Sequence, residues 1–158
     1  MLTFESLIDT AKEKGMPTGK TRGILREYLQ VLILKEMYKL PLGKNLYFTG
    51  GTYLRLVHQT KRFSEDLDFN VDKMSKNDFE NTLEKISNAL EKEGLKAKLI
   101  FNHWDNLFVS ELIFFTSSSL FIEYNNAFLR LTSEKMDGFC KDEVKLKNTA
   151  KYLGKEKE

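Results

Sequence analysis

The residues that decide the fold of this 158-residue chain lie in two short stretches, YFTGGTYLR at residues 47–55 and RFSEDLDF at residues 62–69. The first is an aromatic run followed by Gly50 and Gly51, which favours a short strand that enters a tight turn and then a short helix. In the second, apolar residues alternate with polar ones, which predicts a strand that begins at about Glu65. The predicted order is therefore strand, glycine pair, helix, strand.

The glycine pair is suited to contact a phosphate group. Because Gly50 and Gly51 have no side chain, a ligand can approach the backbone closely. The start of a helix also offers unpaired N–H groups and a partial positive charge, and Thr52 adds a hydroxyl donor. A lone Gly-Gly-Thr is most often only a turn, so this interpretation depends on the acidic stretch that follows.

The acidic stretch is suited to bind a divalent metal ion. On a strand, Asp66 and Asp68 would point to one face with Cα atoms roughly 6.5 to 7 Å apart, so both carboxylates can reach the same ions. Two carboxylates this close repel each other without a cation. Oxygen ligands of this kind suit Mg²⁺ or Mn²⁺, which take further ligands from nucleotide phosphates. The predicted chemistry is phosphoryl or nucleotidyl transfer, in which two metal ions activate a hydroxyl and stabilise the leaving pyrophosphate.

A third carboxylate is expected on a neighbouring strand. Glu123 is the best candidate because it is an acid within residues 120–128, an apolar segment that favours a strand. Glu123 could instead be an exposed strand residue that pairs with a lysine, and Glu111 is a weaker competitor for the catalytic role.

The rest of the chain predicts an α+β fold in one domain, residues 1–158, in which residues 141–158 form a lysine-rich tail or a partial helix. Three further helices are predicted: one at 3–14, one that runs from a Thr18 cap to Pro41, and one at 75–93 with a Ser75 cap. Two strands, at 95–101 and 107–116, are predicted to be joined by a turn at 103–106.

Composition excludes several classes of protein. The net charge of +2 is too weak to indicate nucleic-acid binding by itself. Cys140 is the only cysteine, which excludes an intrachain disulfide and a cysteine cluster for zinc or iron–sulfur. The most apolar stretch, 107–131, contains charged and polar residues, and the chain starts without a secretion signal. We therefore expect a cytoplasmic protein with no membrane partner.

Residues 48–56 and 62–69 together closely resemble the signature of the AbiEii/AbiGii nucleotidyltransferase toxins, a family within the DNA polymerase beta-like nucleotidyltransferase superfamily. The helix that contains residues 26–30 and the strand at 121–124 also fall where that family has comparable elements. The resemblance covers about residues 18–130 and implies a mixed β-sheet flanked by helices.

The resemblance also implies roles for individual residues. It implies that Gly50, Gly51 and Thr52 hold the triphosphate. We also expect three further residues of the motif to bind the nucleotide: Arg55, Arg62 and Ser64. The residues expected to bind metal and act in catalysis are three acids: Asp66, Asp68 and Glu123.

Family members use a nucleoside triphosphate, some add nucleotides to tRNA ends, and they often pair with an antitoxin in phage defence or growth control. We expect an Mg²⁺- or Mn²⁺-dependent nucleotidyltransferase that moves a nucleoside monophosphate to a hydroxyl, with tRNA as a candidate acceptor and an antitoxin as a candidate partner. The alternative is a non-catalytic domain that binds a nucleotide, an RNA or a partner protein. This alternative is considered because the family normally continues into a helical C-terminal half. The lysine and the Arg-Asp-x-x-Asp stretch of that half have no counterpart in these 158 residues. On this ground we expect the 158 residues alone to be a poor transferase.

Overall fold

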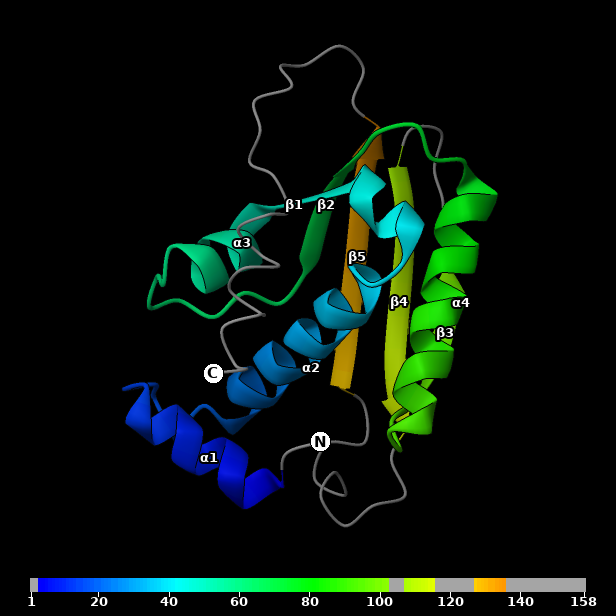
Figure 1. Cartoon of the computed structure of the whole chain (residues 1–158). Helices are drawn as coiled ribbons and strands as arrows, with labels where there is room; N and C mark the ends of the chain where they lie inside the picture. The colour runs from blue at the N-terminus through cyan, green and yellow to red at the C-terminus, as the bar shows by residue number, and fades with distance from the viewer. Residues whose placement is uncertain (1–2, 103–106, 116–126, 136–158) are drawn as a thin grey trace.

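A computed structural model describes residues 3–102, 107–115 and 127–135 of the chain. Helices and strands follow one another along it as shown in Figure 1. Their bounds are α1 Phe4–Glu13, α2 Thr21–Met37, the 3-10 helix η1 Pro41–Asn45, β1 Leu46–Thr49, α3 Gly50–Val57, β2 Leu67–Val71, α4 Lys76–Lys92, β3 Lys96–Phe101, β4 Leu107–Phe115 and β5 Ala127–Lys135. No helix in these ranges is long and apolar enough to cross a membrane.

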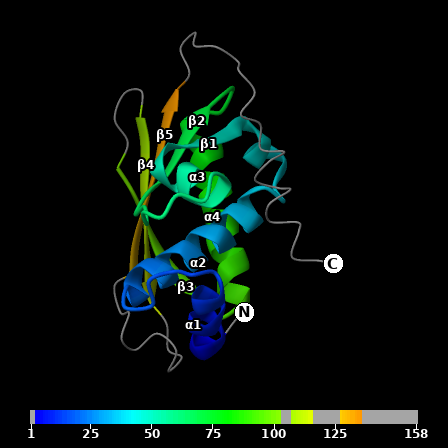
Figure 2. The same cartoon turned by 90° about the vertical axis from the view of Figure 1, so that its left-hand side faces the viewer.

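The strands form one mixed sheet in the order β1-β2-β5-β4-β3. Strands β2 and β5 are parallel, and the other neighbouring pairs are antiparallel. Helices α2 and α4 lie on the same side of this sheet (Figure 2). This arrangement confirms the predicted α+β fold with a mixed sheet flanked by helices.

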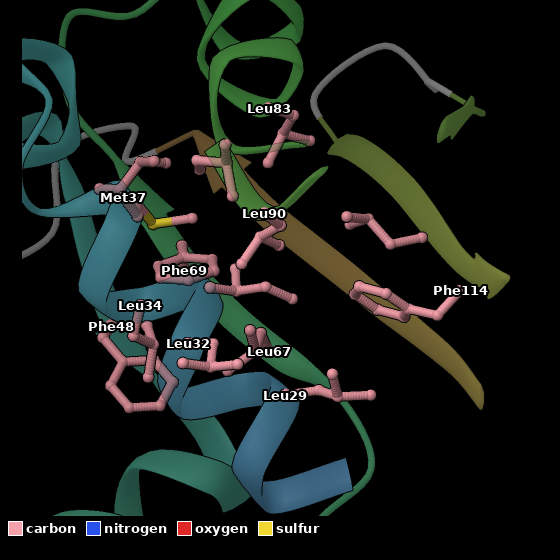
Figure 3. Packing of buried hydrophobic residues seen from close by; sticks show 14 of the residues in the cluster. Leu29, Leu32, Leu34, Met37, Phe48, Leu67, Phe69, Leu83, Leu90 and Phe114 are labelled. Atoms are coloured by element: carbon pink, nitrogen blue, oxygen red, sulfur yellow. The ribbon is translucent and has the colours of Figure 1, made fainter. Parts of the chain in front are cut away.

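The hydrophobic core lies between the sheet and helices α2 and α4 (Figure 3). Strand β2 contributes its alternate apolar residues, Leu67, Phe69 and Val71, all of which are buried. Because successive strand residues point to opposite faces, the half-buried Asp68 and Asn70 between them face away from this core. The core therefore determines which face of β2 carries the acidic side chain.

The helix predicted at 75–93 with a Ser75 cap is confirmed by α4. Its N-cap is Ser75, whose hydroxyl accepts a hydrogen bond from the backbone N–H of Asp78, while the Asp78 carboxylate accepts one from the backbone N–H of Ser75. The following pair of strands, β3 and β4, is antiparallel as predicted. Residues 103–106, predicted as the turn between them, lie outside the described residues.

Other boundaries differ from the predictions. Helix α2 has Lys20 as its N-cap, so the predicted Thr18 cap is wrong. The backbone N–H of Lys20 donates to Pro17 O at 2.9 Å, and this turn leaves Thr18 outside the helix. Strand β2 begins at Leu67 instead of about Glu65, because its pairing with β5 starts there. The short helix η1 was not predicted.

The last strand extends further than predicted. Strand β5, Ala127–Lys135, overlaps the end of the predicted strand at 120–128 and continues past it. It pairs with its sequence neighbour β4 and with β2, which lies about sixty residues earlier. Residues 116–126, which include Glu123, lie outside the described part of the chain, as does the predicted tail at 141–158.

Candidate functional site

The two halves of the sequence motif meet where β1 ends and β2 begins. Thr49, the last residue of β1, pairs in register with Asp68. Gly50 follows with a φ of 77°, a conformation that residues with a side chain rarely adopt. A Cβ on Gly50 would lie 2.8 Å from the Cβ of Asp68, so a side chain there would collide with the aspartate. Glycine at position 50 thus lets the Asp68 side chain lie against the first residue of α3.

The second glycine has a similar close neighbour. Gly51 is exposed, and a Cβ on it would lie 2.7 Å from the hydroxyl oxygen of Ser64. The N-cap of α3, Thr49, makes no side-chain capping hydrogen bond. The backbone N–H groups at the start of α3 therefore stay uncovered by a capping side chain, and they carry the partial positive charge of a helix start. A hydroxyl, a carboxylate and this helix start gather at one place.

A buried polar network lies beneath this helix start. The Thr52 side chain is fully buried, and its hydroxyl donates a short hydrogen bond to the backbone carbonyl of Asp66. Gln30 of α2, only 1% exposed, donates from Nε2 to the carbonyl of Ser64 at 3.1 Å and to Thr52 Oγ1 at 3.4 Å. In this structure Thr52 therefore binds the chain segment that carries Asp66.

The sequence of this chain matches a known family. The family model described as "Nucleotidyl transferase AbiEii toxin, Type IV TA system" matches residues 32–141, a range that includes both motif stretches. The chain belongs to the AbiEii family. The resemblance seen in the sequence is confirmed, and with it membership in a nucleotidyltransferase toxin family of type IV toxin–antitoxin systems.

Solved structures support the same fold for this AbiEii domain. A putative nucleotidyltransferase from H. pylori aligns with a TM-score of 0.57 and 22% identity, over 78% of this chain and 50% of its own. JHP933 from Helicobacter pylori aligns at 0.51 and 22%, over 78% of this chain and 48% of its own. The nucleotidyltransferase toxin MenT4 from Mycobacterium tuberculosis aligns at 0.52 and 18%, over 85% and 44%.

The domain spans about half the length of these solved structures. At such identities the likeness shows the fold alone. A comparison with curated proteins gave no match.

The arginines of the motif differ in their surroundings. Arg55 Nε donates to Glu27 Oε2 of α2 at 2.7 Å, and both side chains are mostly buried. The Arg55 guanidinium also donates to the carbonyl of Thr60 and lies 5.1 Å from the centre of the Phe63 ring. These contacts tie α3 to α2 and to the segment before β2. Arg62, by contrast, is exposed.

The third acid predicted for the AbiEii site cannot be placed by the described residues. Glu123 lies outside them. Asp68 stands level with Thr132 of β5, and Glu111 lies on β4, which β5 separates from β2. Two strand spacings amount to about 10 Å, which weakens the case for Glu111 as a partner of Asp68.

Of the three predicted acids, Asp66 and Asp68 lie within the described residues, and Asp68 is the one seen against the start of α3. Within residues 3–102, 107–115 and 127–135, no group of three or more His, Cys, Asp or Glu side chains is placed to hold a metal ion. Two carboxylates nevertheless fit Mg²⁺, which commonly takes one or two carboxylates from the protein and the remaining ligands from phosphates and water. The donor set suits a metal that arrives together with a nucleotide.

Proposed function

We propose that this AbiEii domain binds a nucleoside triphosphate with Mg²⁺ or Mn²⁺ and transfers its nucleoside monophosphate to a hydroxyl acceptor. The observation that carries the proposal is the close approach of Asp68 to Gly50 and of Ser64 to Gly51. It brings a metal-binding carboxylate next to a helix start that favours phosphate. A metal–triphosphate complex needs both features at one place.

Each residue of the site has a proposed task. The backbone N–H groups at Gly50 and Gly51 would bind phosphate oxygens, with the Ser64 hydroxyl as a further donor. Asp66 and Asp68 would hold the metal ions. When bound, these ions would activate the attacking hydroxyl and stabilise the leaving pyrophosphate.

Four other predicted residues have proposed roles of different kinds. Glu123 remains the proposed third carboxylate. Arg62, which is exposed, is proposed to contact the nucleotide. The hydrogen bonds of Thr52 and Arg55 favour support of the site over direct contact with the ligand.

The biological setting is proposed from the family. The AbiEii description names a toxin of a type IV system, so an antitoxin is the proposed partner and growth control or phage defence the proposed role. A tRNA end as the acceptor rests on the resemblance alone. A cytoplasmic location rests on the composition of the sequence, and a single domain over 1–158 is likewise a proposal. The alternative role, binding without transfer, is separated from the main proposal by the following experiment.

The purified protein is incubated with each α-labelled nucleoside triphosphate, Mg²⁺ and total tRNA, and label in RNA is measured. We expect slow transfer from at least one nucleotide, and loss of transfer in Asp68→Asn because a neutral amide binds Mg²⁺ poorly. Nucleotide binding without transfer to any acceptor would favour the binding-only alternative. Transfer that is equal in Asp68→Asn would contradict the proposed site.

A further inference from the structure

The two aspartates of the site are held in different ways. Asp68 lies within β2 and pairs in register with Thr49 of β1 and Thr132 of β5. Asp66 precedes the first residue of β2, and it lies before both of these registers begin. The sheet therefore fixes the backbone at Asp68 but does not extend to Asp66.

Helices α2 and α3 make buried hydrogen bonds to the backbone of the Asp66 segment. Thr52 donates its hydroxyl hydrogen to the carbonyl of Asp66, and Gln30 donates to the carbonyl of Ser64, two residues earlier. Gln30 also donates to Thr52 Oγ1, so the three bonds form one network. Its two side chains are 1% and 0% exposed, which shields these bonds from competing water.

Two other side chains of α2, Arg26 and Glu27, form ion pairs nearby. Arg26 pairs with Glu65 at 2.7 Å, yet the Glu65 side chain is 76% exposed, and exposed ion pairs contribute little. Glu27 binds Arg55, which lies on α3 and not on the segment itself. Among these three α2 residues, Gln30 is the buried one, and it bonds directly to the backbone two residues before Asp66.

We propose that Gln30 is a positioning residue for the acidic pair, Asp66 and Asp68. It holds the segment from Ser64 to Asp66 through its own hydrogen bond to Ser64 and through its bond to Thr52. Held in this way, Asp66 can share a metal ion with Asp68. The inference rests on the proposed function, because it takes Asp66 as a metal ligand. Groups that orient metal ligands change metal affinity about 10- to 100-fold when they are removed. Gln30 acts on the backbone that carries the carboxylate, through the carbonyl of Ser64 and through Thr52.

The test uses two variants of the whole chain and a matched control for each. Gln30→Met keeps the length of the side chain and removes the amide, while Leu29→Met places the same residue at the neighbouring buried position of α2. Thr52→Val removes the hydroxyl with little change of shape. Thr82→Val does the same to a buried threonine of α4 that donates to the carbonyl of Asp78.

Two readouts are measured on each variant. The first is hydrogen exchange at the backbone amides of residues 60–67, which reports whether the segment is held. The second is metal coupling, the ratio of nucleoside triphosphate affinities in Mn²⁺ and in EDTA. A role that is merely structural would lower global stability but leave metal coupling unchanged.

We expect Gln30→Met and Thr52→Val to speed exchange in residues 60–67 and to reduce metal coupling about tenfold, while both controls stay near the wild type. Affinity in EDTA should stay within about twofold, since the helix start that binds phosphate is intact. If Gln30→Met does not fold, Thr52→Val carries the same test.

The failures of the two proposals can be told apart. Wild-type coupling that persists in Gln30→Met, whether exchange becomes faster or not, overturns the positioning role and leaves the proposed function standing. Absence of coupling in the wild type overturns the metal site of the proposed function, and the positioning role falls with it.

Discussion

The starts of helices α3 and α4 differ in whether side chains cap them. At the start of α4, Ser75 and Asp78 form a capping box, and their hydrogen bonds lower the pKa of the Asp78 carboxyl. At the start of α3, the N-cap Thr49 makes no side-chain capping bond, and two glycines follow it. The start of α4 is therefore capped by its own side chains, and the start of α3 is left open.

This difference has a cost for stability and a use for binding. A capping side chain contributes about 1 kcal/mol to a helix, and a glycine in a helix costs about 1 kcal/mol relative to alanine. Helix α4 also buries a stripe that includes Phe79 and Leu83, whereas α3 buries only Thr52 and Leu56. Helix α3 thus has a less stable start, and that start is the one that lies beside Ser64 and Asp68.

The largest effect that follows from this comparison concerns Gly50. We expect Gly50→Ala to lower the free energy of unfolding by about 2 to 4 kcal/mol, because the new Cβ meets Asp68 and the positive φ becomes strained. Urea unfolding measures this loss. Gly19→Ala is the control, since a Cβ at Gly19 meets nothing within 4 Å. A loss no larger than that of the control would mean that Asp68 does not lie against Gly50.

The next effect concerns the open helix start itself. Gly51→Val should weaken nucleoside triphosphate binding about tenfold or more, roughly 1.4 kcal/mol, because its side chain blocks the approach of phosphate to α3. Calorimetry measures the affinity, circular dichroism confirms folding, and Gly19→Val is the matched control. Unchanged affinity in a folded Gly51→Val variant would reduce the glycine pair to an ordinary turn.

The smallest effect concerns the closed helix start. Ser75→Ala should lower the free energy of unfolding by about 1 kcal/mol, because it removes the cap of α4. Nucleotide affinity should not change. The exposed neighbour Asn77→Ala serves as the control for a substitution in the same turn. A clear loss of nucleotide affinity in Ser75→Ala would contradict the claim that the start of α3, and not the start of α4, binds the nucleotide.

The features that the sequence predicted well depend on local interactions. The cap of α4 needs only Ser75 and Asp78, three residues apart, and the strand, glycine pair and helix from 46 to 57 follow from neighbouring residues. The close approach of Asp68 to Gly50 was also foreseeable in outline, because both lie in one compact motif. Family membership followed from the same two stretches.

The features that the sequence did not predict depend on distant partners. Gln30 lies 34 positions before Ser64, so nothing near it in sequence shows what its amide binds, apart from its polar nature within an apolar stripe. The start of β2 is set by pairing with β5, about sixty residues later, which also moved Asp66 out of the strand. Thr52 was expected to face a ligand, and its inward hydrogen bond became visible only in three dimensions.

The central claim is that a metal ion and a nucleotide bind together at the open start of α3. Calorimetric titration of a nucleoside triphosphate in Mg²⁺ and in EDTA tests it most directly, with the wild type beside the double variant Asp66→Asn, Asp68→Asn. The account predicts that Mg²⁺ raises the nucleotide affinity of the wild type about tenfold or more and does not change the nucleotide affinity of the double variant. Equal affinity in Mg²⁺, in EDTA and in the double variant would contradict it.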